Sequence, residues 1–241
     1  MSLLTCPDAV ADDQRSSADV ARDRHSKPFE VMEFIGVRSG WVALDLFGGD
    51  GYYSEVLAQQ VEQSGLVYLH NSQATKVTPS QLRRRFGSIS RTTGRSQIWP
   101  NIALLDGAIA DLAIASNSVD LVMLVKIYHD VYYQGHGWQL QSKTLFELIH
   151  RVLKPGGILA VIDHTAVAGS GASHAQSLHR IDREFAINDI SQHGFVLNAQ
   201  SDLLVNPADD LQRSVFHPSI RGRSSRFLLT FRKDSPTKKG P

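Results

Sequence analysis

Residues 41–58 read WVALDLFGGDGYYSEVLA, and this stretch decides the fold. An apolar run at residues 42–46 carries one acid, Asp45, and breaks into a Gly-Gly-Asp-Gly turn at residues 48–51. An amphipathic stretch begins directly after the turn, at Tyr52. Glycine lets a ligand approach the backbone closely, and the free N–H groups at a helix start favour electron-rich ligand atoms. The order of buried strand, glycine turn and helix therefore predicts a cradle for a cofactor.

Six more apolar runs follow along the chain and are interpreted as further strands. Most are short, nearly continuous and bounded by turn residues, as expected for parallel strands that are covered on both faces. Helical patterns lie between the runs, which predicts a layered α/β fold with a mainly parallel sheet. The expected strands span residues 42–46, 66–69, 102–105, 119–125, 158–162, 195–197 and 227–231.

The helical patterns carry their own start and stop signals. Apolar residues at positions 145–153 recur with helical spacing and form one stripe. Residues 154–157, KPGG, end that helix because proline cannot continue it and glycine permits the reversal. Pro28 is suited to open an N-terminal helix, and a further helix is marked by Leu178 and closed by Gly194.

Composition sets the remaining limits. A chain of 241 residues can bury one good core, and neither a repeat nor a flexible linker divides it. We expect a single domain at residues 18–233, including an N-terminal helical lid, between a flexible segment 1–17 and a disordered tail 234–241. The net charge of +1 gives no global field that would attract nucleic acid or a membrane, so neither is expected as a partner. One cysteine, no long apolar run and no signal-peptide pattern favour a cytoplasmic protein.

The spacing of the glycine turn indicates its ligand. Open parallel sheets bind ligands beyond the carboxyl ends of their strands, so the residues that follow each strand matter most. A dinucleotide turn reads G-x-G-x-x-G; here Gly49 and Gly51 fit the first pair, but Ser54 occupies the third position. No Gly-Lys-Ser/Thr ending supports a phosphate loop. The pattern D-x-x-x-G-x-G, with Asp45 at the strand end to attract an ammonium group, suits S-adenosylmethionine better.

Three ordered motifs strengthen this interpretation: LDLFGGDG at residues 44–51, SVDLVMLV at 118–125 and LKPGGILAVID at 153–163. In these motifs the chain resembles the class I S-adenosylmethionine-dependent methyltransferases. The resemblance implies a Rossmann-like three-layer sandwich whose mostly parallel, seven-stranded sheet has an antiparallel last strand. The chain is also similar to a poorly characterised branch of the family, through GYYSE, DVARDRHSKP, LVNPADD and the polar pairs HD and DH after two strands.

The resemblance implies a set of cofactor contacts. The glycine turn is expected at the methionine part of the cofactor, and Asp106 at the adenine. Phe47 occupies a position that the family usually gives to glycine. Asn71 stands where a ribose-binding acid is expected, roughly 20 residues after the turn, and it or His70 would bond a ribose hydroxyl. The full predicted set is Asp45, Phe47, Gly48, Gly49, Gly51, Tyr52, His70, Asn71, Asp106, Gly107, Ala108 and Lys126.

Two polar pairs follow the fourth and fifth strands, beside the expected methyl group. His129 titrates near neutrality and can act as a general base, with Asp130 to orient it or to contact the substrate. The alternative is that this pair caps the next helix or bridges the loop. Asp163 and His164 form the second pair, at the same edge of the sheet. We treat all four residues as catalytic candidates.

Arg180 is the fifth catalytic candidate. It lies on the next predicted helix, where its guanidinium would clamp an anionic group of the substrate. A salt bridge to Asp163 or Asp182 is an equal alternative. The two His-Asp pairs have ligand types that bind metals, but no short ligand spacing supports a site, so no metal is expected.

Aromatic side chains are placed to cover the methyl group, because the cationic sulfur favours an aromatic face. Tyr53 follows core spacing on its helix, so Tyr52 is the better contact. Tyr132, Tyr133 and Trp138 complete this aromatic set.

Three functions stay open at this point. The leading hypothesis is S-adenosylmethionine-dependent methyl transfer to a small-molecule acceptor. The second is a catalytically inactive module that binds S-adenosylmethionine or S-adenosylhomocysteine, motivated by Phe47 and Asn71. The third is a nicotinamide-dependent oxidoreductase, which rests on the strand and helix alternation and is disfavoured by the missing third glycine. The acceptor and the oligomeric state are not predicted.

Overall fold

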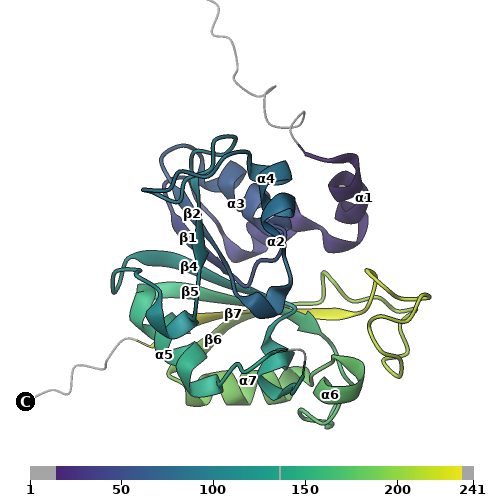
Figure 1. Ribbon diagram of the computed structural model, residues 1–241. Coiled ribbons are helices and arrows are strands. Elements are labelled where there is room, and N and C mark those ends of the chain that lie inside the picture. The colour runs from purple at the N-terminus through teal and green to yellow at the C-terminus, as the bar shows by residue number, and fades with distance from the viewer. Residues whose placement is uncertain (1–14, 136, 235–241) are drawn as a thin grey trace, which may run out of the picture.

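A seven-stranded sheet forms the centre of the computed structural model, which describes residues 15–135 and 137–234. The strand order is β3-β2-β1-β4-β5-β7-β6 (Figure 1). Neighbours from β3 to β5 pair in parallel, whereas β7 runs antiparallel to both β5 and β6. The predicted mostly parallel sheet with an antiparallel last strand is confirmed. The strands are β1 (Val42–Leu46), β2 (Leu66–Asn71), β3 (Ile102–Asp106), β4 (Val119–Val125), β5 (Leu153–His164), β6 (Phe195–Ser201) and β7 (Arg226–Lys233).

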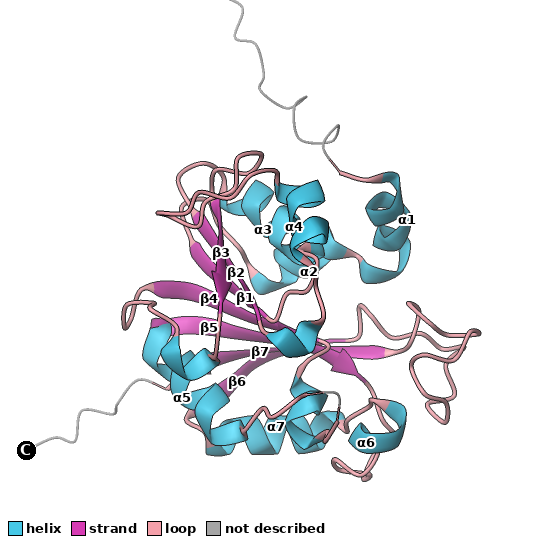
Figure 2. Ribbon diagram, viewed as in Figure 1, coloured by secondary structure: helices cyan, strands magenta, loops and turns pink. Residues whose placement is uncertain are grey.

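Helices cover both faces of the sheet and complete the three layers (Figure 2). Helices α1 to α4 lie on one side of the sheet, and α5 to α7 lie on the other (Figure 1). Short 3₁₀ helices follow three strands, at Gln73–Thr75, Ile109–Asp111 and Tyr128–Tyr132. The α-helices are α1 (Ser17–Ser26), α2 (Pro28–Ile35), α3 (Tyr52–Val61), α4 (Pro79–Phe86), α5 (Ser142–Val152), α6 (Ala175–Leu178) and α7 (Arg183–Gln192).

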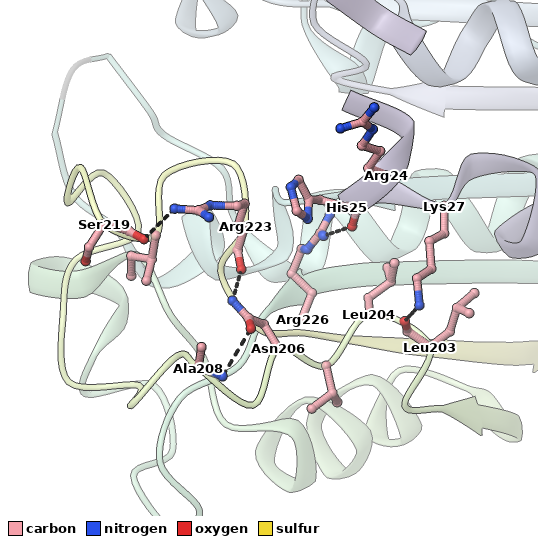
Figure 3. A pocket seen from close by; sticks show the side chains of 12 residues that line it. Arg24, His25, Lys27, Leu203, Leu204, Asn206, Ala208, Ser219, Arg223 and Arg226 are labelled. Atoms are coloured by element: carbon pink, nitrogen blue, oxygen red, sulfur yellow. Dashed lines mark hydrogen bonds between the residues drawn. The ribbon is translucent and has the colours of Figure 1, made fainter. Parts of the chain in front are cut away.

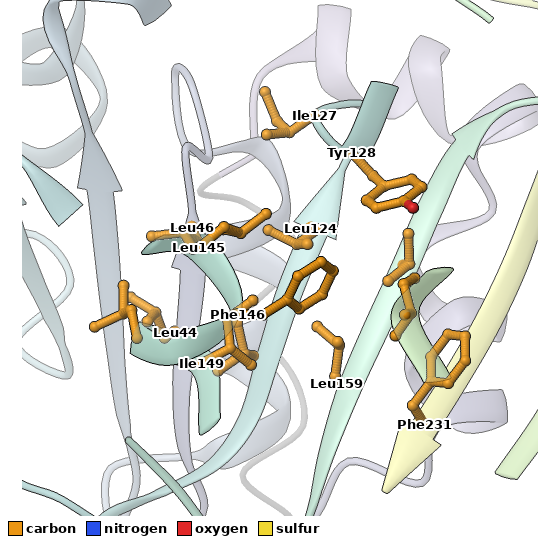
Figure 4. Packing of buried hydrophobic residues seen from close by; sticks show 14 of the residues in the cluster. Leu44, Leu46, Leu124, Ile127, Tyr128, Leu145, Phe146, Ile149, Leu159 and Phe231 are labelled. Atoms are coloured by element: carbon orange, nitrogen blue, oxygen red, sulfur yellow. The ribbon is translucent and has the colours of Figure 1, made fainter. Parts of the chain in front are cut away.

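Each face of the sheet has its own apolar core. On one face, α5 packs Leu145, Phe146 and Ile149 against a cluster that includes Leu124 of β4 and Leu159 of β5 (Figure 4). On the other face, α2 and α3 close a second cluster over the same strands. Each fully buried aliphatic or aromatic side chain stabilises the fold by about 1.5–3 kcal/mol. The two cores hold the central strands between the two helical layers.

The predicted helix from Leu178 to Gly194 needs a correction, because the structure has two helices there. Helix α6 ends at Leu178, and α7 begins at Arg183. His179 takes the left-handed conformation with φ 54°, which stops α6. The Asp182 side chain accepts a hydrogen bond from a backbone N–H of the first turn of α7 and starts that helix. The break turns the segment between the two helices toward the edge of the sheet where the strands end.

Some predictions fall outside the described residues. The segment predicted to be flexible, Cys6 and the tail predicted to be disordered lie wholly or mostly in residues 1–14 and 235–241. Within the two described ranges, no helix combines the length and the apolar character needed to cross a membrane.

The strand register brings the predicted site residues to one edge of the sheet. At the end of β1, Leu46 lies opposite His70 of β2, and Asn71 lies opposite Asp106 of β3. Strand β4 flanks β1 on its other side and is followed by β5. Because parallel strands end at the same edge, the loops after β1, β2, β3, β4 and β5 surround one common space.

Candidate active site

A cavity of about 800 Å³ opens at this carboxyl edge. Its walls come from the loops after β1, β2, β4 and β5, from α1 and from the segment at residues 215–221. Two further cavities, of about 410 and 730 Å³, adjoin it through the shared wall residue Ala74. The predicted residues in the wall of the largest cavity are Asp45, Phe47, Gly48, Gly49, Tyr52, Lys126, His129, Asp130 and His164.

The three glycines of the turn have different surroundings. A Cβ atom at Gly48 would collide with the Asp45 carboxylate, and one at Gly51 would collide with the Phe86 ring. Gly49 has φ +66° and no atom within 4 Å of an added Cβ, and it lines the large cavity. Gly48 and Gly51 therefore allow the turn to pack, whereas Gly49 is where a ligand can approach the backbone.

Asn71 holds the glycine turn with both ends of its side-chain amide. Gly49 N donates to Asn71 Oδ1 at 3.0 Å, and Asn71 Nδ2 donates to Gly49 O at 2.8 Å. An ionised acid could not make the second bond, since it has no hydrogen to donate. Asn71 thus shapes the turn, and the predicted ribose contact would have to use an amide that is already bonded.

Asp45 presents an unpaired carboxylate oxygen beneath the turn. Its side chain is buried, and Oδ2 accepts a hydrogen bond from Ser54 Oγ at 2.7 Å. Oδ1 is buried and receives no hydrogen bond from any residue that the structure describes. Burial raises the pKa of Asp45 to about 6. A buried acceptor without a partner costs free energy, and an ammonium group in the cavity would remove that cost.

Phe47 forms the wall between the large cavity and the cavity of about 410 Å³. It has φ 58°, a left-handed conformation that costs a non-glycine residue about 1–2 kcal/mol. The ring meets His70 edge-on at 4.9 Å and Trp138 at 5.4 Å between centroids. His70 Nε2 lies 3.1 Å from Gly107 O, and burial lowers the pKa of His70. Neutral His70 therefore donates to that carbonyl and supports the aromatic wall.

The end of β3 lies on the other side of this wall. Gly107 and Ala108 line both smaller cavities, and the exposed Asp106 lines the larger of the two together with Asn71. The residues expected at the adenine therefore sit beside the turn, separated from the catalytic candidates by Phe47.

His129 and Asp163 form a buried pair at the other end of the large cavity. His129 Nδ1 lies 2.8 Å from Asp163 Oδ1, and His129 N donates to Asp163 Oδ2 at 2.8 Å. Asp163 is fully buried and also accepts from His164 N. The carboxylate fixes the proton on Nδ1, so His129 turns Nε2 toward its cavity neighbours. Desolvation lowers the pKa of His129, but the charge and hydrogen bond of Asp163 outweigh it, and the pKa is raised.

Asp130 and Lys126 add two groups that titrate near neutrality. Asp130 Oδ1 lies 3.4 Å from His129 Nε2, and burial raises the pKa of Asp130 to about 6. Burial, followed by the charges of Arg22 and Arg226, lowers the pKa of Lys126 to about 7. Both side chains line the cavity, so small changes of environment decide their charge.

His164 lines the same cavity and stays neutral. Its Nδ1 lies 2.7 Å from Ser224 Oγ, and burial lowers its pKa well below the usual value. Together with His129 and Asp130 it confirms that the polar pairs after β4 and β5 meet at one place.

The predicted role of Arg180, to clamp an anionic group of the substrate, is wrong. The side chain is fully buried and contributes nothing to the wall of the large cavity. Its guanidinium bonds both oxygens of Asp209 at 2.9 Å and the backbone carbonyls of Thr165 and Arg213. The predicted salt-bridge partners were also wrong, since the acid is on the segment before β7. Arg180 therefore ties the loop after β5 to residues 209–213 and does not clamp a substrate.

Sequence reasoning missed His179, which lines the cavity. Its Nδ1 lies 3.3 Å from His129 Nε2, and the break between α6 and α7 places it there. The sequence holds the signal: Asp182 is an N-cap residue, and a helix that starts after it cannot also contain His179. Phe216 and Arg221 were missed as well, and their segments carry no comparable motif. Arg22, in the segment predicted as an N-terminal lid, also lines the cavity.

The aromatic predictions divide in two. Tyr52, Tyr133 and Trp138 line the cavity, and the Arg22 guanidinium stacks 3.7 Å from the centre of the Tyr52 ring. The prediction for Tyr132 was wrong. Its ring packs against the Phe185 ring, with 5.2 Å between the centroids, and it is not in the cavity wall.

Helix α1 is fastened beside the cavity at several points. The Tyr52 hydroxyl donates to Asp23 Oδ1 at 2.5 Å, and Arg85 Nη1 pairs with Asp19 at 3.0 Å. Arg226 donates a hydrogen bond to the backbone carbonyl of His25, and Lys27 Nζ donates to Leu203 O at 3.0 Å. Figure 3 shows both bonds in a small basic pocket between α1 and the segment before β7. These contacts carry Arg22 into the cavity wall.

The comparisons with known proteins agree with this geometry. The family whose model matches is described as "Methyltransferase domain", and it matches residues 44–161. No curated protein matches the sequence significantly. Among solved structures, an S-adenosylmethionine-dependent methyltransferase from Aquifex aeolicus has a TM-score of 0.62 at 16% identity, over 95% of this chain and 100% of that one.

Two other solved structures share the fold at similar distance. The 1,6-didemethyltoxoflavin-N1-methyltransferase from Burkholderia thailandensis, with 1,6-didemethyltoxoflavin and S-adenosylhomocysteine bound, has a TM-score of 0.57 at 16% identity, over 98% of this chain and 93% of that one. The [4+2]-cyclase SpnF has a TM-score of 0.57 at 18% identity, over 92% and 85%. The matched domain, the strand order and the glycine turn agree: residues 44–161 carry a methyltransferase domain within the Rossmann-like methyltransferase fold, and the comparisons support S-adenosylmethionine as the cofactor.

Proposed function

We propose that the protein transfers a methyl group from S-adenosylmethionine to a small molecule that binds at the ends of β4 and β5. The observation that carries the proposal is the Asp163–His129 pair, which turns Nε2 toward a cavity that also contains Asp45 and Gly49. A neighbour in fold that holds a small molecule together with S-adenosylhomocysteine supports an acceptor of this size.

The residues on the β1 side fit the cofactor. The unpaired Asp45 Oδ1 suits its ammonium group, and the open surface over Gly49 suits close contact with its methionine part. Phe47 and the residues after β3 offer an apolar wall and backbone groups for the adenine. When bound, S-adenosylmethionine supplies an electrophilic methyl group on a sulfonium sulfur.

The residues on the β4 and β5 side would hold and activate the acceptor. His129 offers a lone pair on Nε2, and Asp163 stabilises positive charge that develops on the ring. Arg22, Lys126 and Arg221 line the same cavity and favour an acceptor with an acidic group. Alignment of the acceptor with the methyl group then supplies much of the acceleration.

Two measurements test this proposal. Calorimetry should show binding of S-adenosylmethionine and S-adenosylhomocysteine, and no binding of either at millimolar ligand would refute it. Mass spectrometry should then detect a methylated product in a panel of phenols, hydroxy acids and N-heterocycles. Product formed by the wild type should fall about 100-fold or more in Asp163→Asn. Tight S-adenosylhomocysteine binding without turnover of any acceptor would favour the inactive binding module instead.

A further inference from the structure

Three metal-ligand atoms converge at the acceptor end of the cavity. His129 Nε2 lies 3.3 Å from His179 Nδ1 and 3.4 Å from Asp130 Oδ1. One ligand atom from each of the three residues lies within 4.8 Å of the other two. All three side chains line the cavity wall, His129 and Asp130 being buried and His179 half-buried.

The two separations from His129 Nε2 match the ligand spacing of a transition metal. Zinc binds imidazole nitrogen and carboxylate oxygen at about 2.0–2.1 Å, so neighbouring ligand atoms of a tetrahedral site lie about 3.3–3.4 Å apart. Both contacts of His129 Nε2 have this length. A pair of imidazoles with one carboxylate suits zinc and iron, whereas magnesium and calcium prefer oxygen ligands alone.

Asp163 supplies the support that metal-binding histidines usually have. A histidine that binds a metal through one ring nitrogen commonly donates the other N–H to a carboxylate, which fixes its tautomer. His129 does so through Nδ1, at 2.8 Å from the fully buried Asp163. Asp163 is itself held by the backbone N–H groups of His129 and His164.

Two carboxylates supply negative charge beside the three ligand atoms. Asp130 and Asp163 carry two negative charges when ionised, and both are buried beside His129. Asp130 receives no hydrogen bond from another side chain in the described ranges, and its side chain is buried. A cation between Asp130 and the two imidazoles would compensate a carboxylate that the protein otherwise leaves poorly solvated.

We propose that His129 Nε2, His179 Nδ1 and the Asp130 carboxylate bind a divalent transition-metal ion, with zinc as the best fit. Three protein ligands leave one position open toward the cavity, which is the arrangement of catalytic rather than structural sites. This role rests on the proposed function. With the ion bound, His129 Nε2 is a ligand and no longer accepts a proton, so the ion replaces it in activating the acceptor. An acceptor hydroxyl bound at the open position loses its proton to solvent more readily, its oxygen forms the new bond to the methyl carbon, and the carbon–sulfur bond breaks.

Metal binding to the untagged full chain, after removal of metal with a chelator, tests the proposal. Titration with Zn²⁺ should reveal one strong site per chain, and Co²⁺ at the same site should give the intense visible absorption of a tetrahedral ion. Mg²⁺ should not compete. His179→Ala and Asp130→Asn should each weaken Zn²⁺ binding at least about 100-fold, and Asp163→Asn should weaken it about 10–100-fold.

His150→Ala is the matched control, because His150 is exposed at the end of α5 and lies outside the cavity wall. It should bind Zn²⁺ as the wild type does. Absence of a strong site in the wild type would overturn the proposal, as would equal loss in His150→Ala. Binding of S-adenosylhomocysteine to metal-free protein separates the two proposals: if it persists while Zn²⁺ does not bind, only the metal site fails.

Discussion

The two sides of the cavity use their polar side chains differently. On the β1 and β2 side, Asn71 is bonded to Gly49, and His70 is bonded to Gly107, so side chains shape the backbone. On the β4 and β5 side, His129 and Asp130 turn polar atoms toward each other and toward the cavity. Two atoms on the first side are exceptions, since Asp45 Oδ1 and His70 Nδ1 are buried without a hydrogen-bond partner among the described residues.

This difference separates a general part of the site from a specific one. A cofactor common to a whole family can be held by backbone geometry, which many sequences can build. An acceptor needs particular side chains with capacity to bond or to titrate, and these are gathered on the second side. The cofactor side should therefore tolerate little change of shape, and the acceptor side little change of chemistry.

The largest expected effect concerns the framework behind the acceptor side. Arg180→Ala leaves Asp209 buried without its partner, which should lower the free energy of unfolding by about 3–5 kcal/mol. Urea denaturation measures this. Arg183→Ala removes a partly exposed pair with Asp202 and should cost no more than about 1 kcal/mol. If the folded Arg180→Ala variant keeps its stability but loses methyl transfer, the result would instead support the substrate clamp that the sequence predicted.

The next effect concerns ligand binding on the cofactor side of the cavity, at Gly49. Gly49→Val should weaken S-adenosylhomocysteine binding about 100-fold or more, because its side chain enters open space that the ligand needs. Valine at positive φ also costs about 1–2 kcal/mol of stability. Gly156→Val has the same positive φ and open surroundings at the other edge of the sheet, so it controls for strain. Calorimetry measures the S-adenosylhomocysteine affinity of both variants. Equal affinities of the two variants would contradict our placement of the ligand.

A smaller effect follows from the pKa of Asp45. Burial raises it to about 6, and an ammonium ligand favours the ionised form. S-adenosylhomocysteine affinity should therefore be full above about pH 7, fall about twofold at pH 6 and fall about tenfold at pH 5. Asp45→Asn should bind more weakly and lose this dependence. An unchanged pH profile in that variant would show that another group controls binding.

The smallest effect distinguishes two roles for Asn71. Asn71→Ala removes two hydrogen bonds to Gly49 and should cost about 1–2 kcal/mol of stability and a few-fold in S-adenosylhomocysteine affinity. Asn71→Asp should also bind more weakly, since it loses the donor to Gly49 O. Tighter binding by Asn71→Asp would instead support a ribose contact at this position.

The sequence predicts the fold well because the fold rests on periodic burial. All seven apolar runs are strands, and the strand ends carry Asp45, Lys126, His129 and His164 to one cavity. Residues directly after parallel strands must meet at one edge, so their proximity follows from order alone.

The parts of the site that the sequence does not predict depend on contacts between distant segments. Arg180 pairs with Asp209, which lies 29 positions further along the chain in an irregular segment. His179 enters the cavity because a local N-cap breaks what apolar spacing indicates as one helix. Asn71 stands at the expected position, yet its bonds to Gly49 depend on the three-dimensional path of the turn.

A crystal structure with S-adenosylhomocysteine tests the division of the cavity most directly. We predict that the ligand's amino group lies within hydrogen-bond distance of Asp45 Oδ1, that the ligand contacts the protein backbone at Gly49, and that its sulfur faces His129 and Asp130. A ligand whose sulfur points away from His129, or whose amino group does not contact Asp45, would contradict the account.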